Sequence, residues 1–357
     1  MLPHIPQDIW DEVILSIDPD DYRTLANCAL VQRDWVPICR FRLSRHGHIN
    51  IRGLDEYYER VVDRFLRPEG MTPWLHGVKS LSFDADFDVG QDRRGYRFFH
   101  DFAGRLPNLR SLTIGCVDWT AVPHHPSTYL MFSTFSSVTY LKLYQTSFPS
   151  FTVFRRTLTS LPSLTTLVLY NHTDHWFPLP REELWNRSSL MSRPALRVFD
   201  ICFENTYEEL DVLFHWLLQT PSRTSIRDLA FSTVRNSSSN THESRHLRIG
   251  SLDFISALAL SVSTLRIDCD GKSSASLHEA CTILIVACLL LLGGIPLSLF
   301  RNLHTLVINM IQGGWEQLAS MLRNFPSRLR CIRRGSLHHH RSRLRRSFRR
   351  LRIRLDA

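Results

Sequence analysis

The chain has 357 residues, 43% of them hydrophobic and 22% charged, which is the composition of an ordinary globular protein. Its net charge of +9 at pH 7 is concentrated at one end. Residues 327–357 contain twelve arginines and one acidic residue, a local charge of +11 that leaves −2 for the rest of the chain. A slightly acidic body lacks a basic stripe for a phosphate backbone, so the composition argues against nucleic acid as a partner.

The N-terminus and the cysteines indicate a reducing compartment. A secretory signal has a basic segment followed by an apolar one, whereas this N-terminus carries acidic residues from Asp8 onward. We therefore expect a cytoplasmic or nuclear protein. The eight cysteines are scattered without a C-x-x-C pair, which favours free thiols over disulfides or a zinc site. We expect no metal and no other cofactor.

The first 46 residues carry the pattern of three short helices. Aliphatic residues recur at helical spacing from Ile9 to Ile17, after Pro6, which suits a helix start. The pair Asp20–Asp21 is typical of the N-cap of a second helix that ends near Leu30–Val31, and a third helix begins near Arg33. Three helices of this size bury little surface, so we expect this segment to need a neighbour for stability.

The order of residues in this segment resembles the F-box family. Like that family, this segment has a hydrophobic residue before Pro, followed by spaced aliphatic residues. It ends with a V-x-x-x-W motif, from Val31 to Trp35. The resemblance implies binding to the Skp-type adaptor of a cullin-RING ubiquitin ligase. It assigns this contact to Ile5, Pro6, Ile9, Val13, Leu25, Leu30, Val31, Trp35 and Pro37. For Val13, Leu25 and Trp35, packing between the three helices is the alternative role.

A six-residue phrase, apolar-x-x-Leu-x-apolar, recurs along the rest of the chain. Its central residues are Leu81, Leu112, Leu141, Leu167, Phe199, Leu229, Leu265 and Leu306, at steps of 26 to 41 residues. A recurring period of this kind predicts a solenoid of stacked units. The alternation within each phrase predicts a short strand with one buried face. Helical patterns precede several phrases, at 96–106, 151–161, 207–218 and 252–260.

Helix, turn and strand at this period resemble a leucine-rich repeat, which implies a parallel concave sheet with helices on the convex side. The predicted fold is therefore α/β, with a helical connector following the N-terminal helices and a solenoid following the connector. The predicted domains are 1–46 for the F-box-like module, 47–77 for the connector, 78–332 for the solenoid and 333–357 for an Arg-rich, disordered tail. An ordinary α/β domain is the alternative. The Asn that often follows the strand in such repeats is mostly missing, and Asn171 and Asn309 are its nearest equivalents.

Residues that flank the central position of each phrase point away from the core, because strand residues alternate between faces. We expect these residues to line the concave surface: Tyr140, Lys142, Tyr144, Tyr170, Asp200, Asp228, Arg266 and Asp268. A mixed lining that contains Tyr favours protein recognition. The alternative is a solvated sheet face without a specific partner.

Two segments depart from the repeat. Residues 280–300, within an irregular insert at 271–300, carry no charge and are long enough to span a bilayer. Gly293, Gly294, Pro296 and the immediate return of the repeat argue against a membrane span and favour a buried helix. Both this insert and the Arg-rich tail are also open to interpretation as gene-model artefacts, and the tail has a further alternative as a nuclear-import or nucleic-acid patch.

No phosphate-binding loop, nucleophile elbow or H-E-x-x-H motif occurs in the sequence, so we expect no enzymatic activity. The leading hypothesis is a substrate receptor of an SCF-type ubiquitin ligase. It would bind the Skp-type adaptor, and through it a cullin, and would hold an unknown protein substrate on its repeats. The alternative is a repeat scaffold for protein interactions that works without a ligase.

Overall fold

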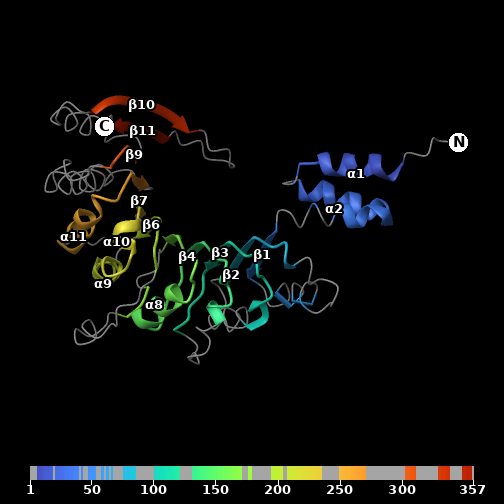
Figure 1. Ribbon diagram of the computed structural model, residues 1–357, viewed down its shortest axis with the longest axis horizontal. Helices are drawn as coiled ribbons and strands as arrows, with labels where there is room; N and C mark the ends of the chain where they lie inside the picture. Colours follow the sequence, from blue (N-terminus) through green and yellow to red (C-terminus); the bar gives the residue numbers. More distant parts are fainter. Residues whose placement is uncertain are drawn as a thin grey trace. The chain divides into compact units, whose positions relative to one another are not determined.

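The structure is a computed structural model, and it shows an α/β protein with parallel strands (Figure 1). It describes residues 6–18, 21–39, 42, 47–53, 58–59, 62–63, 66, 75–85, 100–120, 131–170, 176–178, 194–203, 207–234, 249–270, 302–310, 329–337 and 348–355. The chain divides into two compact units. The first comprises Met1–Leu141 with Ser160–Ser163, and the second comprises Lys142–Thr159 with Leu164–Ala357.

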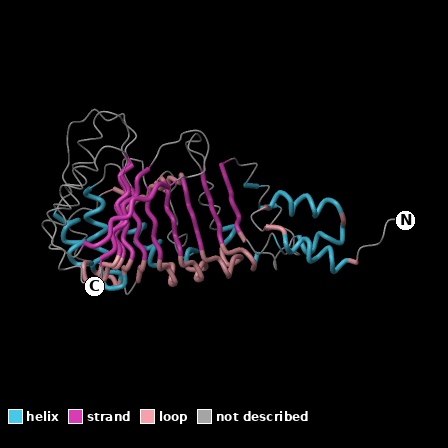
Figure 2. Tube along the Cα trace, turned by 90° about the horizontal axis from the view of Figure 1, so that it is seen from above, coloured by secondary structure: helices cyan, strands magenta, loops and turns pink. Residues whose placement is uncertain are grey.

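Short helices open the first unit. These are α1 (Gln7–Ser16), α2 (Tyr22–Val31) and the 3-10 helix η1 (Arg33–Trp35), after which residues 36–39 are helical. Figures 1 and 2 both show α1 and α2 side by side. Ile14, Leu25 and Cys39 form the buried centre of this group. One apolar side chain from each helical segment therefore closes a small core.

The first unit continues with three parallel strands, β1 (His48–Gly53), β2 (Ser80–Ala85) and β3 (Ser111–Gly115). The central residues Leu81 and Leu112 lie side by side in the register, and both are buried. Ile49 of β1 pairs with Leu81 and is also buried. The expectation of a helical connector at 47–77 therefore needs correction at its start. The short strand β1 was missed because His46 stands where the recurring phrase begins with an apolar residue, and Ile49 stands where it has Leu.

The second unit contains five further parallel strands in chain order: β5 (Thr166–Tyr170), β6 (Val198–Phe203), β7 (Asp228–Val234), β8 (Thr264–Asp270) and β9 (Thr305–Met310). The central residues Leu167, Phe199, Leu229, Leu265 and Leu306 are aligned across these strands. Strand β4 (Tyr140–Tyr144) carries the central residue Leu141, which is also buried. The prediction that the phrases form parallel strands is confirmed.

Helices of the second unit are α8 (Phe151–Thr159), α9 (Tyr207–Leu218), α10 (Ser222–Ser225) and α11 (Ile249–Leu258), close to three of the predicted helical ranges (Figure 1). Aromatic contacts join them to the strands. Phe214 of α9 stacks on Phe254 of α11 with ring centroids 4.3 Å apart. Both rings meet the central residue Phe199 of β6 edge-on. The helices thus pack against the buried face of the strands.

A recurring backbone hydrogen bond links successive strands. The carbonyl of Gly47 accepts from the N–H groups of Lys79 and Ser80, both at 2.8 Å. The same arrangement recurs with the carbonyls of Lys79, Arg110, Thr165, Arg197, Arg227 and Ser263 as acceptors. Each acceptor stands two residues before a central position. Because the backbone supplies these bonds, neighbouring strands keep one geometry while the loops between them vary in length.

The C-terminal strands differ from the predicted tail. Strand β10 (Leu329–Leu337) begins where a ninth strand was expected, but residues 348–355, expected to be disordered, form β11 (Phe348–Leu355). Strand β11 lies between β9 and β10 and is antiparallel to both. The physical reason is its alternation, because Arg352 and Arg354 separate Leu351, Ile353 and Leu355 at the period of a strand.

The predicted buried helix in the uncharged segment 280–300 lies outside the described residues. Among the helices that the structure describes, none has the length and apolar character needed to cross a membrane. The preference for a buried helix over a membrane span at 280–300 therefore stays a prediction from the sequence.

Candidate functional site

Four large hydrophobic side chains stand exposed on the N-terminal helices. Ile9 and Val13 of α1 are 50% and 46% exposed, and Leu30 and Val31 at the end of α2 are 86% and 71% exposed. We call these four residues the apolar helix surface. Apolar groups gathered on one small module in this way are a common mark of a protein interaction site.

The local structure of α1 explains why Ile9 and Val13 face outward. Pro6 precedes the helix, and its carbonyl accepts the N–H groups of Ile9 at 3.2 Å and Trp10 at 3.5 Å. One helical turn separates Ile9 from Val13, so they share a side of the helix. Ile14, next in the chain, turns inward and is buried. Helix α1 therefore presents one face to the core and another to solvent.

Helix α2 starts at a well-formed cap. The Asp21 carboxylate accepts a hydrogen bond from the Thr24 N–H at 3.0 Å and another from the Thr24 hydroxyl at 2.6 Å. These two bonds hold the pKa of Asp21 below its ordinary value, the hydroxyl bond having the larger effect. From this start the helix buries Leu25 and ends with Leu30 and Val31 in solvent. The cap thus determines where the exposed pair lies.

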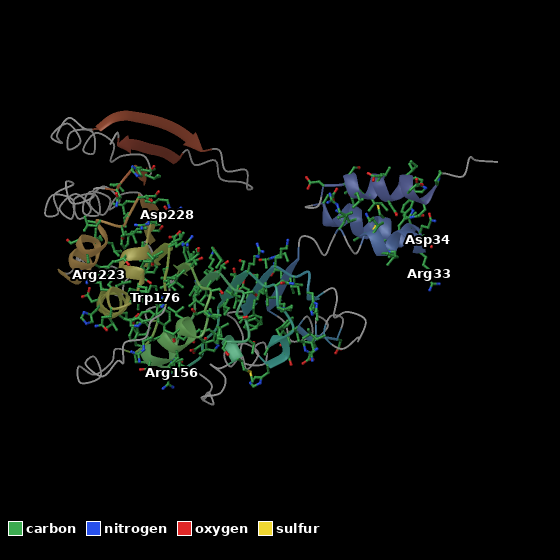
Figure 3. All side chains as sticks on the ribbon, in the orientation of Figure 1. Arg33, Asp34, Arg156, Trp176, Arg223 and Asp228 are labelled. Atoms are coloured by element: carbon green, nitrogen blue, oxygen red, sulfur yellow. The ribbon has the colours of Figure 1, made fainter. Side chains whose placement is uncertain are left out.

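An aromatic contact joins α1 to the 3-10 helix η1, which follows α2. The rings of Trp10 and Trp35 are 4.7 Å apart between centroids, with an interplanar angle of 44°. Trp10 is adjacent to Ile9 and Trp35 follows Val31 by four residues, so the end of α2 lies near the first half of α1. Figure 3 labels Arg33 and Asp34, between Val31 and Trp35, at this end. The contact brings the two parts of the apolar helix surface to the same end of the module.

The predicted adaptor residues fall into three groups. Exposed at the surface are Pro6, Ile9, Val13, Leu30, Val31 and Pro37. Leu25 has no exposed surface and belongs to the core, so of its two expected roles the structure assigns packing. Trp35 is partly buried and packs against the same core. Ile5 lies outside the described residues.

The predicted concave residues occupy alternate strand positions. Partial exposure is found for Tyr140, Lys142, Tyr144, Tyr170, Asp200, Asp228 and Arg266. Within β4 and β5 these residues alternate with buried ones. Asp268 lies on β8, and its side chain is outside the description. The burial of β4 and β5 therefore alternates, whereas in β7 Ala230 is buried like Leu229 and Phe231. That the predicted residues line a concave surface stays a prediction.

Two pairs form on this strand face. The rings of Tyr144 and Tyr170 are 5.7 Å apart between centroids. The guanidinium of Arg266 forms an ion pair with the carboxylate of Asp200 across strand β7. Side chains that were expected only to share a face are thus organised into an aromatic pair and a neutralised ionic pair.

Comparisons with models of known protein families and with curated proteins found no match for this chain. Within the described part of the chain, no group of three His, Cys, Asp or Glu side chains is placed to hold a metal ion. Thiols rather than disulfides are found at Cys28, Cys39, Cys116 and Cys202. Burial raises the pKa of the Cys39 thiol, with a smaller effect from Cys28.

Sequence reasoning missed two asparagines that join the repeats. The side chain of Asn108 donates to the carbonyl of His76 at 2.8 Å, and that of Asn302 donates to the carbonyl of Leu260 at 2.6 Å. Each Asn stands four residues before a central leucine. The sequence carries both asparagines, but a leucine-rich repeat is expected to have its Asn after the strand and not before it. Here the amide bonds connect the segments that precede the strands.

Proposed function

We propose that this protein is a substrate receptor of an SCF-type cullin-RING ubiquitin ligase. In this proposal the F-box-like helices bind the Skp-type adaptor, and the leucine-rich-repeat-like strands bind the target protein. The observation that supports it best is the apolar helix surface, Ile9, Val13, Leu30 and Val31. These are four of the positions at which the F-box resemblance expects the adaptor contact.

The packing of the helices supports an intermolecular role for these side chains. Ile14, Leu25 and Cys39 already fill the core of the module, so the four exposed residues are not needed to close it. Burying an aliphatic side chain of this size against a partner contributes about 1.5–3 kcal/mol. A partner that covers all four side chains would therefore bind residues that the core of the module does not use.

The repeat strands support the second half of the proposal. They present partly exposed tyrosines and charged residues on one face, a mixture that suits recognition of a protein segment. The chemistry of ubiquitin transfer would belong to the partner enzymes. This protein would act by holding its target near the loaded ubiquitin, which raises the effective concentration of the reacting groups.

Co-purification of the full chain with a Skp-type adaptor tests the proposal. We expect the wild-type protein to retain the adaptor and the double variant Ile9→Asp/Val13→Asp to lose it, because two carboxylates would be buried in an apolar contact. The matched control is Leu260→Asp, since Leu260 is 59% exposed but lies in the second unit. The control should bind as wild type does.

Two results would overturn the proposal. One is a wild-type protein that fails to retain the adaptor, which favours the ligase-independent scaffold. The other is a double variant that binds the adaptor as tightly as wild type while circular dichroism shows both proteins folded. A third variant, Leu30→Asp, guards against local unfolding of α1, because Leu30 is the most exposed of the four residues.

A further inference from the structure

One end of the strand face in the second unit combines two aromatic rings with a positive charge. Lys142 and Tyr144 stand two residues apart on β4, so they share its exposed face. Tyr144 packs on Tyr170 of β5, and the N–H of Gln145 donates to the Tyr170 carbonyl at 2.7 Å. The buried Leu143 lies between the partly exposed Lys142 and Tyr144 in the chain. The backbone therefore holds the tyrosine pair in place before any partner binds.

Two cations on this face, Arg266 and Lys142, differ in their ion pairing. Arg266 is engaged by Asp200, so this cation and this anion neutralise each other. Lys142 differs, because no acidic side chain within the described part of the chain forms an ion pair with it. Of the two cations predicted for the concave lining, the one beside the tyrosines is therefore the one open to a charged partner.

The surroundings of Lys142 decide which chemical group fits. A partner that covers this corner would remove water from the ammonium, and this is favourable only if the partner supplies a negative charge. The paired rings of Tyr144 and Tyr170 lie at the same end of this face. These rings supply apolar contact to the residues beside the negative charge. A cationic or neutral segment would leave the ammonium repelled or unpaired.

We propose that Lys142, Tyr144 and Tyr170 form the site that receives an anionic side chain of the target protein, a carboxylate or a phosphate. This inference rests on the proposed substrate-receptor function and narrows its target to proteins with an acidic or phosphorylated segment. Lys142 is the charged contact, and the two tyrosine rings provide an apolar wall beside it.

Peptide selection by the purified full chain, without adaptor, tests this site. The probes are 11-residue peptides whose central residue is Asp, Glu, phosphoserine, phosphotyrosine, Ser, Tyr or Lys, with randomised flanking residues. We expect the wild-type protein to enrich peptides with an anionic centre. Lys142→Ala should weaken binding to those peptides at least about tenfold, the value of one charge-assisted hydrogen bond. Comparison of the peptides centred on Asp or Glu with those centred on phosphoserine or phosphotyrosine shows whether the site prefers a carboxylate or a phosphate.

Three further variants sharpen the test. Lys142→Arg should keep the selection for anions, and Lys142→Glu should shift it toward a central Lys. Lys79→Ala is the matched control, because Lys79 is an exposed lysine that precedes β2 in the first unit, and its selection should equal that of wild type. Denaturation midpoints for all variants show whether each remains folded.

The inference is overturned if the wild-type protein binds no peptide, if it shows no preference for an anionic centre, or if folded Lys142→Ala and Lys142→Glu keep that preference. Adaptor binding, measured on the same preparations, separates this failure from failure of the proposed function. A protein that binds the adaptor but does not select anions overturns only the site. Anion selection without adaptor binding overturns only the ligase role.

Discussion

Arg266 on β8 reaches Asp200 on β6 by crossing the intervening strand above Ala230. The register places Asp200 beside Ala230 and Ala230 beside Arg266, so the ion pair spans two strand spacings. Ala230 is 6% exposed, and its methyl group is small enough to leave room for the arginine stem. A side chain of minimal size therefore permits a contact between two residues that are 66 positions apart in the chain.

We expect Ala230→Leu to destabilise the second unit by about 1–3 kcal/mol, because a larger side chain has no space beneath the ion pair. Arg266→Ala should cost less, about 0–1 kcal/mol, since both charged side chains remain partly in contact with water. Urea denaturation of the two variants beside wild type measures both values. A larger loss for Arg266→Ala than for Ala230→Leu would contradict this account of the contact.

Gly47 starts the chain of backbone hydrogen bonds, and we expect its replacement to be costly. Its φ angle is +38°, and a Cβ atom there would lie 2.3 Å from the carbonyl oxygen of Gly77 and 2.6 Å from the nitrogen of Lys79. Gly47→Ala should therefore destabilise the first unit by about 2 kcal/mol or more. Gly104→Ala is the control, because Gly104 also has a positive φ but its Cβ would meet no atom within 4 Å.

In the control, the free energy of unfolding should fall only by the conformational cost of a positive φ, about 1–2 kcal/mol. Denaturant midpoints of the two alanine variants, compared with that of wild type, measure the difference. Equal losses at the two positions would mean that the backbone near Gly77 adapts and that the close approach carries no cost.

Leu25 and Leu30 have opposite roles in α2, and alanine variants should separate them. Leu25→Ala removes a fully buried side chain and should destabilise the N-terminal helices by about 2–5 kcal/mol. Leu30→Ala changes an exposed side chain and should alter stability by no more than about 0.5 kcal/mol. Amide hydrogen exchange in α1 and α2 measures these local stabilities.

If the proposed function holds, Leu30→Ala should weaken adaptor binding while leaving exchange protection intact. Leu25→Ala should reduce both, because it acts on the folded state of the helices. Loss of protection in Leu30→Ala would instead place this side chain in the core of the module.

The Asp21 cap should make the stability of α2 depend on pH. Hydrogen bonds from Thr24 lower the pKa of Asp21 in the folded state, so the carboxylate stabilises the helix above its ordinary pKa of 3.8. This contribution is lost as pH falls through the lowered folded value. Between about pH 6 and about pH 3, hydrogen exchange of the α2 amides should therefore show a shrinking difference between wild type and Asp21→Ala.

Asp21→Asn is the control for this titration. Its amide oxygen can cap the helix but does not ionise over this range, so the wild-type protein should lose stability relative to Asp21→Asn as the pH falls. A difference between wild type and Asp21→Ala that stays constant down to about pH 3 would show that the carboxylate charge has no part in the cap.

The repeated phrase was enough to predict which residues align across the strands. Leu167, Phe199 and Leu229 meet in one register because the pattern that buries one strand recurs in the next. The exceptions have local causes. Ile49 replaces the leucine of the phrase, and β11 alternates Arg with aliphatic residues in a segment whose composition had suggested disorder.

The sequence by itself determined the parallel strands, their register and the faces of their side chains, because burial on alternate strand positions is a local pattern repeated along the chain. Only the tertiary structure decided which apolar residues of α2 are core and which are exposed. Leu25 and Leu30 are equally apolar and lie about 140° apart around the helix, so their roles depend on which side Ile14 and Cys39 occupy. The same reason applies to Arg266 and Asp200, since their pairing requires a small residue on a strand between them.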